Sequence, residues 1–388
     1  MKERILFATV AAGGAHVSSS EAMAQALEAQ YPGRFDLKVS ELMLEYGFET
    51  FDQRHKDAWR SALEWPWSVR IGQALSDRVP ELNVFLQRRL LDKFAQKAAK
   101  ELQKSPPDLI VATHGWMNTA LALAQRRYGL KVPVVTFVTL TVDASAIWVE
   151  PWAERYLIGA ARGKRVLAKL GVPAEKIDVV GYPVKQPFLG APTKRVARQT
   201  LGLDDDFTCL IVLGGEGVGN IPHELVRWLS ILERPPQIVV IAGRNETLKA
   251  ELEALELAHL HVKGFVTDMA SHMAASDLVI GKVSGATVFE ALAVGRPILA
   301  TRKSYRSEDE YINYLHGKGL GHFCPDRESL QARVSEYQSD PARLAEVKRR
   351  TEQLDFAGMS ERIAHYLVHY LETRTPLTAL TGQGVGWD

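Results

Sequence analysis

The sequence predicts an α/β protein with two domains, each built on a parallel β-sheet. The chain has 388 residues, which is enough for two or three domains with substantial cores. Short apolar runs alternate with helix-length amphipathic stretches, a pattern typical of parallel sheets covered by helices. The strand-like runs are ILFATV, DLIVATH and VPVVTFVTL in the first half, and CLIVLGG, QIVVIAG, HLHVKGF, DLVIGKV and RPILAT in the second.

The boundary between the two domains is predicted from a loop-rich stretch. The alternation restarts near Cys209, after GYPVKQPFLGAPTK, which carries three prolines and two glycines. We therefore expect one domain over residues 1–185 and a second over 186–355. In residues 356–388, the stretch MSERIAHYLVHYLE has apolar residues at helical spacing, which predicts a final helix before a tail.

The composition is that of an ordinary globular protein. Hydrophobic residues make up 46% of the chain and charged residues 24%, and the net charge of +1 offers no overall field for nucleic acid. Cys209 and Cys324 are far apart and lack a metal-ligand spacing, so no disulfide framework or zinc site is predicted. Asp204 to Asp206 precede a strand, where a solvated turn is the expected role, so we predict no metal cofactor.

Neither a secretory signal nor a membrane-spanning segment is predicted. The N-terminus runs directly into a strand-like segment and lacks a small-residue cleavage site. No run of about 18 to 20 apolar residues is present, because Asp143 interrupts the most apolar stretch. We expect a cytoplasmic protein whose membrane contact, if it has any, is peripheral.

The first candidate ligand-binding loop is rich in glycine. In open parallel sheets, ligands bind outside the carboxyl ends of the strands. The loop after CLIVL contains Gly214, Gly215, Glu216, Gly217 and Asn220. Its backbone amides could approach a diphosphate, and the following helix N-terminus would favour the negative charge. A tight strand-to-helix turn without a ligand is the alternative interpretation.

Two further loops follow the next strands of the second half. Arg244 could hydrogen-bond phosphate oxygens, although a solvated loop arginine is the commoner case. Phe265 and Val266 could form a wall against a planar base. The alternative for these two side chains is an ordinary place in the core.

The fourth loop is the most informative. Ser284, Gly285, Ala286 and Thr287 form a small-residue turn suited to a helix start, and Glu290 follows. The amides of the turn could bind phosphate while the carboxylate accepts hydrogen bonds from two ribose hydroxyls. Thr287 and Glu290 also have the spacing of a capping box, which would occupy the same carboxylate.

The first half carries candidate residues for a second substrate. Gly13 and Gly14 permit a tight turn after the first strand, which places His16 at the start of a helix. A neutral imidazole can accept a proton near pH 7, as a general base requires. His114 and Trp148 also follow strand-like segments and could line an acceptor site, although His114 could equally be a hydrogen-bonded core residue.

Six segments carry a resemblance to a known family. LGGEGVGN, VVIAGRNETL, VKGFVTDM and VSGATVFEALAVGRPIL, in this order, resemble the donor-domain signatures of glycosyltransferase family 28, whose members make monogalactosyl- or glucosyl-diacylglycerol. AAGGAHVSSSEAMAQAL and VVGYPVKQPF resemble its N-terminal and interdomain segments. The resemblance covers most of the chain and is weakest over residues 45–105. It implies the GT-B fold, with two Rossmann-like domains facing an interdomain cleft and a final helix that crosses back to the first domain.

The resemblance also implies roles for residues of the second domain, which would bind a UDP-sugar. Phe265 and Val266 would border uracil, and Glu290 would bind ribose. The loops 214–220 and 284–287 would surround the diphosphate. Glu308 falls near the position where the family contacts the hydroxyls of the donor sugar.

Three positions depart from the family pattern. Ser307 and Tyr311 replace its usual residues beside the donor sugar, so the identity of the sugar stays open. Leu140 stands where related enzymes tend to carry an aspartate in the acceptor domain, and Asp143 follows three residues later. Asp143 is the candidate to replace that aspartate.

These features together predict a hexosyltransferase. A lipid hydroxyl, such as that of diacylglycerol, would attack the anomeric carbon of the UDP-sugar with inversion. His16 would accept the proton, and the donor loops in place of a metal would stabilise the departing UDP. Two alternatives remain open: a UDP-sugar epimerase of the same fold, and a non-catalytic, membrane-associated regulator that binds a UDP-sugar.

Residues 54–104 are basic and rich in aromatic residues. They contain 11 lysines and arginines against 6 acidic residues, together with Trp59, Trp65, Trp67 and Phe85. Such helices can lie on an anionic bilayer surface. A solvated basic face with its tryptophans in the core is the alternative. The lipid acceptors of the family favour peripheral contact with the inner face of the cell membrane.

Overall fold

The computed structural model describes residues 2–11, 13–64, 66–212, 221–303 and 306–377, and of residues 59–64, 66 and 221 it describes the backbone only. The chain divides into two compact units. The first consists of Met1–Gln186, Ser304–Ser307 and Phe356–Asp388, and the second of Pro187–Lys303 and Glu308–Asp355. The division after Gln186 lies one residue from the boundary expected from the sequence.

The first unit contains a six-stranded sheet in which every pairing is parallel. The strand order is β2-β1-β3-β4-β5-β6. The chain leaves β1 towards one edge of the sheet and returns at β3 towards the other, so the switch point lies between β1 and β3. The strands are β1 (Glu3–Ala8), β2 (Phe35–Ser40), β3 (Leu109–Ala112), β4 (Val134–Val138), β5 (Arg155–Ile158) and β6 (Ile177–Val179).

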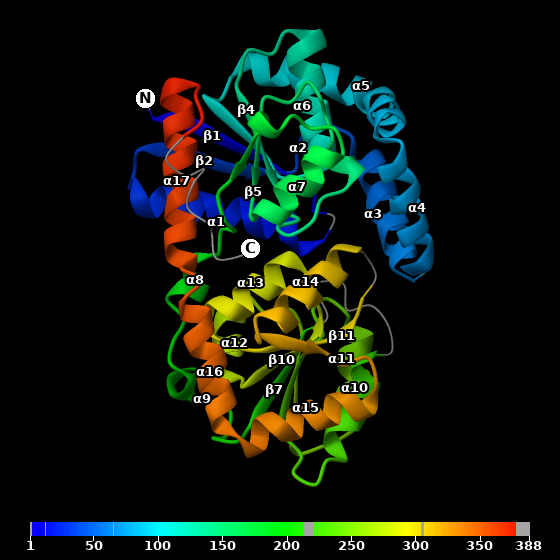
Figure 1. Cartoon of the computed structure of the whole chain (residues 1–388), viewed down its shortest axis with the longest axis vertical. Coiled ribbons are helices and arrows are strands. Elements are labelled where there is room, and N and C mark those ends of the chain that lie inside the picture. The colour runs from blue at the N-terminus through cyan, green and yellow to red at the C-terminus, as the bar shows by residue number, and fades with distance from the viewer. Residues whose placement is uncertain (1, 12, 65, 213–220, 304–305, 378–388) are drawn as a thin grey trace. The chain divides into compact units, whose positions relative to one another are not determined.

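Helices flank this sheet (Figure 1). The long helix α5 packs against α6, and together they bury one face of the sheet in an apolar cluster. The helical elements are α1 (Gly14–Gln30), α2 (Leu42–Glu45), α3 (Glu49–Glu64), α4 (Pro66–Arg78), α5 (Pro80–Lys104), α6 (Gly115–Tyr128), η1 (Ala146–Trp148), α7 (Ala161–Lys169), η2 (Ala174–Lys176) and α17 (Phe356–Thr373).

The last helix, α17, packs in the first unit although it follows the second in sequence. It lies against α1 (Figure 1). Ile363, Tyr366, Leu367 and Tyr370 form a buried stripe at helical spacing, as the sequence pattern predicts. The Tyr366 hydroxyl also donates a hydrogen bond of 2.5 Å to the carboxylate of Asp178.

The second unit contains another six-stranded parallel sheet, ordered β12-β11-β10-β7-β8-β9. Its switch point lies between β7 and β10, whose ends approach closely. A Cβ at Gly281 (φ +149°) would lie 2.1 Å from the carbonyl oxygen of Val212, so this position needs glycine. The strands are β7 (Thr208–Val212), β8 (Gln237–Ile241), β9 (Leu260–Lys263), β10 (Leu278–Lys282), β11 (Ile298–Arg302) and β12 (Gly321–Phe323).

Nine helices accompany this sheet in the part of the chain that is described. They are α8 (Gln186–Leu189), α9 (Lys194–Leu201), α10 (Ile221–Ser230), α11 (Glu246–Glu253), α12 (Met269–Ala275), α13 (Gly285–Ala293), α14 (Arg306–Gly317), α15 (Arg327–Ser339) and α16 (Pro341–Glu352), with α8 joining the two units. The two parallel sheets confirm the predicted α/β architecture. No helix over the described ranges is long and apolar enough to cross a bilayer.

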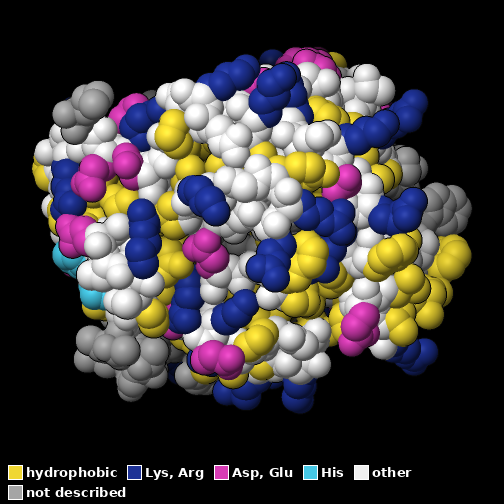
Figure 2. All heavy atoms as spheres, turned by 90° about the horizontal axis from the view of Figure 1, so that it is seen from above, with side chains coloured by type: hydrophobic (Ala, Val, Ile, Leu, Met, Phe, Trp, Pro, Cys, Tyr) yellow, Lys and Arg dark blue, Asp and Glu magenta, His cyan; other side chains and the backbone are white. Residues whose placement is uncertain are grey.

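Helices α4 and α5 expose large apolar side chains. Trp67 is 62% exposed, so the interpretation that the tryptophans of this region lie in the core is wrong for it. Phe85 is 54% exposed. Trp59 and Trp65 lie outside the described side chains. In Figure 2, hydrophobic side chains lie at the surface of the molecule beside Lys and Arg side chains. Large apolar side chains are normally buried, and a contiguous exposed group of them usually marks an interaction site.

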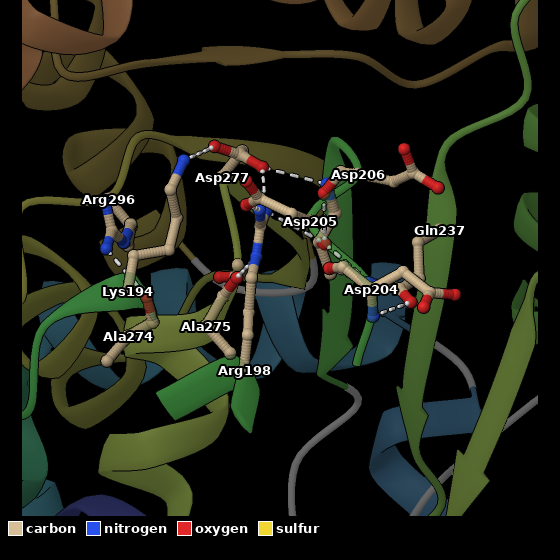
Figure 3. Close-up of polar contacts among 12 residues, drawn as sticks. Lys194, Arg198, Asp204, Asp205, Asp206, Gln237, Ala274, Ala275, Asp277 and Arg296 are labelled. Atoms are coloured by element: carbon tan, nitrogen blue, oxygen red, sulfur yellow. Dashed lines mark hydrogen bonds and ion pairs between the residues drawn. The ribbon is translucent and has the colours of Figure 1, made fainter. Parts of the chain in front are cut away.

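A buried ion-pair network joins the strands of the second unit at their amino ends (Figure 3). The Arg198 guanidinium donates to Asp277 (2.8 Å), to the carbonyl oxygen of Ala275 (3.0 Å) and to Asp205 (2.5 Å). Lys194 donates to the second oxygen of Asp277 at 2.6 Å. Because Arg198 and Asp277 are almost fully buried, each requires the other as a partner.

Candidate functional site

The candidate residues of the first unit meet at the switch point of its sheet. His16 follows β1 in the first turn of α1, and His114 follows β3 immediately before α6. The N-cap residue of α1 is Gly13, with a φ of +87° that favours glycine. A Cβ on Gly13 or Gly14 would meet no atom within 4 Å, so there is open space beside this turn.

The His16 ring is fixed in one tautomer. Its Nδ1 lies 2.6 Å from the carbonyl oxygen of Thr113 and 3.2 Å from the hydroxyl oxygen of Thr139. A carbonyl oxygen can only accept, so Nδ1 carries the proton and Nε2 carries the lone pair. Burial lowers the pKa of His16 to about 4, against the partial opposition of the hydrogen bond to Thr113. The imidazole is therefore neutral at pH 7 and has a nitrogen that can accept a proton.

His114 and Trp148 lie beside His16. The rings of His16 and His114 meet edge to face at 4.7 Å, and the indole of Trp148 lies 6.0 Å from the His16 ring. His114 is the N-cap of α6, because its Nδ1 accepts a hydrogen bond of 3.1 Å from the backbone N–H of Trp116. Burial lowers the pKa of His114 well below its usual value, and His16 and His55 lower it further. His114 is thus the buried, hydrogen-bonded histidine that the alternative interpretation expected.

His55 completes the histidine cluster, which we define as His16, His55 and His114. The centre of its ring lies 3.8 Å from that of the Trp116 ring, with the two planes tilted by 36°, and 5.6 Å from that of the His114 ring. Burial lowers its pKa too. The sequence analysis missed His55, because it lies within α3 and no motif marks it. Thr113 was missed as well, although its place directly after a strand and before His114 was a usable signal.

Asp143 is buried and forms an ion pair with Arg306. Both of its carboxylate oxygens accept hydrogen bonds from Arg306, at 3.2 and 3.0 Å, and Arg306 clusters with the first unit. Arg306 also donates to Asp77 of α4 at 2.8 Å. A bidentate pair of this kind fixes the orientation of the carboxylate, and the proposed role of Asp143 in place of the family's aspartate stays a prediction. Leu140, at the family's acidic position, is a partly buried apolar contact of the neighbouring core.

The candidate donor loops of the second unit follow four adjacent strands. These strands are β10, β7, β8 and β9, so their carboxyl ends lie side by side along one edge of the sheet. The glycine-rich loop after β7 lies outside the described residues, and with it Gly214, Gly215, Glu216, Gly217 and Asn220. The other three loops are described.

Phe265 and Arg244 come together from two of these loops. The Arg244 guanidinium carbon lies 4.9 Å from the centre of the Phe265 ring. The Phe265 side chain is 59% exposed, so the interpretation of an ordinary core residue is wrong for it, and Val266 is partly buried. An exposed ring beside a cation at a strand end presents a flat face on which a planar base could stack.

The turn after β10 caps a helix in a different way from the one expected. Ser284 is the N-cap of α13, and its hydroxyl accepts from the backbone N–H of Thr287 at 3.5 Å. Thr287 is therefore inside the first turn, and Glu290 is the sixth residue of the helix. The proposed capping box between Thr287 and Glu290 is wrong, because the cap precedes it by three residues. Gly285 and Ala286 form the first two positions of α13.

Glu308 is buried at the end of β10 and pairs with a lysine that the sequence analysis did not single out. Its carboxylate lies 3.2 Å from the ammonium of Lys282, the last residue of β10. Ser307 and Tyr311 beside it are buried as well. Within the described ranges, no three His, Cys, Asp or Glu side chains gather as metal ligands do. The expected absence of a metal cofactor stays a prediction.

Comparison with known families supports the resemblance from both halves of the chain. A model of the monogalactosyldiacylglycerol (MGDG) synthase family matches residues 16–184, and one of glycosyl transferases group 1 matches residues 218–354. The chloroplastic monogalactosyldiacylglycerol synthase of Spinacia oleracea is 26% identical over 348 residues, which cover 86% of this chain. The first half of the chain thus resembles the monogalactosyldiacylglycerol synthases, and the second half resembles the glycosyl transferases of group 1.

Bacterial relatives and solved structures extend the comparison. A processive diacylglycerol beta-glucosyltransferase of Staphylococcus carnosus is 27% identical over 73% of this chain and 72% of its own length. The crystal structure of Anabaena Alr3699/HepE in complex with UDP-glucose matches 94% of this chain and 99% of its own, with a TM-score of 0.58 and 18% identity. At that identity the match shows the GT-B fold alone. The chain spans about two thirds of the length of the plant relatives that it matches.

Proposed function

We propose that this protein transfers a hexose from a UDP-sugar to the hydroxyl of a lipid such as diacylglycerol, with inversion and without a metal. One observation carries the proposal: the Nδ1–H of His16 donates to Thr113, which leaves the lone pair on Nε2 at the switch point of the acceptor-side sheet. The names of the relatives support a diacylglycerol acceptor and a hexosyl group.

The proposed step is a single displacement. The acceptor oxygen forms a bond to the anomeric carbon, the bond from that carbon to the diphosphate oxygen breaks, and its electron pair leaves with UDP. Nε2 of His16 receives the hydroxyl proton. A pKa of about 4 makes His16 a weak base. A weak base suffices when the proton leaves late, because the attacking oxygen becomes strongly acidic as its new bond forms.

The donor loops of the second unit supply binding for UDP in this proposal. Phe265 and Arg244 would hold uracil from one face, while the amides at the start of α13 and the 214–220 loop would bind the diphosphate. Glu290 would accept hydrogen bonds from the ribose. Glu308, oriented by Lys282, would accept hydrogen bonds from the hydroxyls of the sugar.

A direct assay tests the proposal against its alternatives. The purified protein is incubated with UDP-glucose or UDP-galactose and diacylglycerol in detergent micelles, with and without EDTA, and the lipid products are identified by mass spectrometry and NMR. A β-linked glycolipid that forms equally in EDTA supports the proposal, since the donor is α-linked. An epimerised UDP-sugar formed without acceptor points to an epimerase. Tight UDP binding without turnover on any acceptor points to a regulator.

A further inference from the structure

We propose that one face of helices α4 and α5 docks on an anionic bilayer, and we name it the α4–α5 surface. The inference deepens the proposed function and rests on it for the choice of a lipid partner. Seven large apolar side chains, between 51% and 62% exposed, make up this surface: Trp67, Ile71, Leu75, Leu82, Phe85, Leu86 and Leu90.

These side chains lie in stripes. On α4, Trp67, Ile71 and Leu75 are four residues apart and so share one face of the helix. On α5, the spacing of Leu82, Phe85, Leu86 and Leu90 places them together in the same way, while Val84, Leu91 and Phe94 face the core. A surface helix usually sets a polar face against its buried one. The first half of α5 is apolar on both faces, which is typical of a helix that buries its outer face in something else.

The charges around the apolar stripes are mostly positive. Residues 66–104 carry eight lysines and arginines against four acidic residues. Among the described residues, the exposed side chains of Arg78, Arg89 and Lys93 take part in no ion pair, whereas Asp92 pairs with Arg127. The Arg89 guanidinium carbon lies 5.8 Å from the centre of the Phe85 ring. Apolar side chains interleaved with unpaired cations complement a membrane surface that carries anionic phospholipids.

A cavity of about 670 Å³ opens beside the same surface. Phe85 and Arg89 belong to both, and Val84, Arg88 and Leu170 contribute further apolar and cationic lining. Arg127 also lines the cavity, so its three arginines outnumber its two acidic residues, Glu81 and Asp92. Apolar and arginine side chains together fit the glycerophosphate end of a phospholipid, whose phosphate would face Arg89.

The docking helices also hold the acceptor side of the candidate site. Asp77 of α4 accepts a hydrogen bond of 2.7 Å from the backbone N–H of Ala146, and Asn83 of α5 donates one of 2.7 Å to its carbonyl oxygen. Ala146 begins η1, which carries Trp148 to within 6.0 Å of the His16 ring. The surface that would meet the bilayer is therefore part of the same rigid assembly as the proposed base, as a lipid acceptor requires.

Flotation with lipid vesicles tests the docking proposal by itself, because the assay requires neither a UDP-sugar nor catalytic activity. The full chain is mixed with vesicles of phosphatidylcholine alone or with 30% phosphatidylglycerol, and the floated fraction is measured. We expect Leu82→Ser, Leu86→Ser and Leu90→Ser together to weaken binding to anionic vesicles by about a hundredfold, since each buried leucine contributes well over 1 kcal/mol. Arg78→Gln, Arg89→Gln and Lys93→Gln together should weaken it by about a hundredfold, at about 1 kcal/mol for each cation, and leave binding to neutral vesicles unchanged.

The second unit offers a matched control. Val196, Ile231 and Leu255 are also large and exposed, and the triple serine variant should float like the wild type. Equal flotation of the α4–α5 variants and the wild type would overturn the proposal. The proposal would also be overturned if the wild type were a dimer, the triple leucine variant were a monomer, and both floated equally. In that case a second copy of the chain, and not a bilayer, would cover this surface. A wild type that floats on anionic vesicles but transfers no sugar would overturn the proposed function and leave the docking surface standing.

Discussion

Two polar clusters in this protein, one partly and one fully buried, lie at opposite ends of parallel strands. The histidine cluster of the first unit lies at the carboxyl ends of β1 and β3, and the Arg198–Asp277 network of the second unit lies at the amino ends of β7 and β10. In the network, the guanidinium and the carboxylate are charged and paired. In the cluster, burial keeps the imidazoles neutral, and the hydrogen bond from His16 Nδ1 to Thr113 leaves the lone pair on Nε2.

The difference shows how burial of polar groups can serve two ends. In a buried ion pair, each charge compensates the other, and removal of one partner leaves the other charge uncompensated. Because Lys194 and Arg198 belong to α9, the network holds this helix to the sheet. A buried neutral imidazole with one nitrogen engaged costs little and keeps the other nitrogen for chemistry. We therefore expect variants of the cluster to change activity and variants of the network to change stability.

The largest expected effect is on catalysis. His16→Ala should lower the transfer rate by about a thousandfold, the usual contribution of a general base, while UDP affinity and the thermal midpoint stay near those of the wild type. Transfer assays, UDP titration and a thermal scan measure the three quantities. His259→Ala, which removes a histidine at the amino end of β9, is the control and should transfer normally. Wild-type rates in His16→Ala would remove this residue from the mechanism.

The next effect is on stability. Arg198→Ala should lower the free energy of unfolding of the second unit by about 3 to 5 kcal/mol, because it strands the buried Asp277 carboxylate. Denaturant titration measures the change, and activity per folded molecule should persist. Arg195→Ala, an exposed arginine on the same helix, should have an effect below about 0.5 kcal/mol. Similar losses from the two substitutions would contradict a special role for the network.

A smaller effect is expected on donor binding. Phe265→Ala should weaken UDP binding about tenfold, since stacking of a base on an aromatic ring contributes about 1 to 3 kcal/mol. Isothermal titration calorimetry with UDP measures the dissociation constant. Phe265→Tyr should restore most of the affinity, and Ile231→Ala, another exposed apolar side chain of this unit, should leave it unchanged. If Phe265→Ala binds UDP as tightly as the wild type, uracil does not lie on this ring.

The last expected effect appears only below pH 6.5 and is a pH dependence of stability from the histidine cluster. Folding lowers the pKa of His16 from 6.5 to about 4, so the unfolded chain binds the proton more readily. Stability is then complete above pH 6.5 and is lost as the pH falls towards 4. Denaturant titrations at several pH values should show a shallower decline in His16→Asn than in the wild type. Identical declines would mean that His16 does not titrate as described.

Much of the fold could be predicted from local patterns. All eight apolar runs form strands, and the restart of the pattern marks the second sheet. The four strands that were missed are β2, β5, β6 and β12, three of which are at sheet edges. Edge strands are covered less completely and carry weaker apolar runs, as FDLKVS does in β2, and β6 and β12 have only three residues each.

The sequence by itself determined the two-sheet architecture and the strand-end loops, because strand and helix periodicities are local and apolar runs report burial directly. Only the tertiary structure decided how the candidate residues are used. Thr113, 97 residues from His16, sets its tautomer, and Arg306 engages Asp143 from 163 residues away. Exposure of Trp67 and Phe265 likewise depends on which distant elements cover them, and a single chain pattern does not encode that packing.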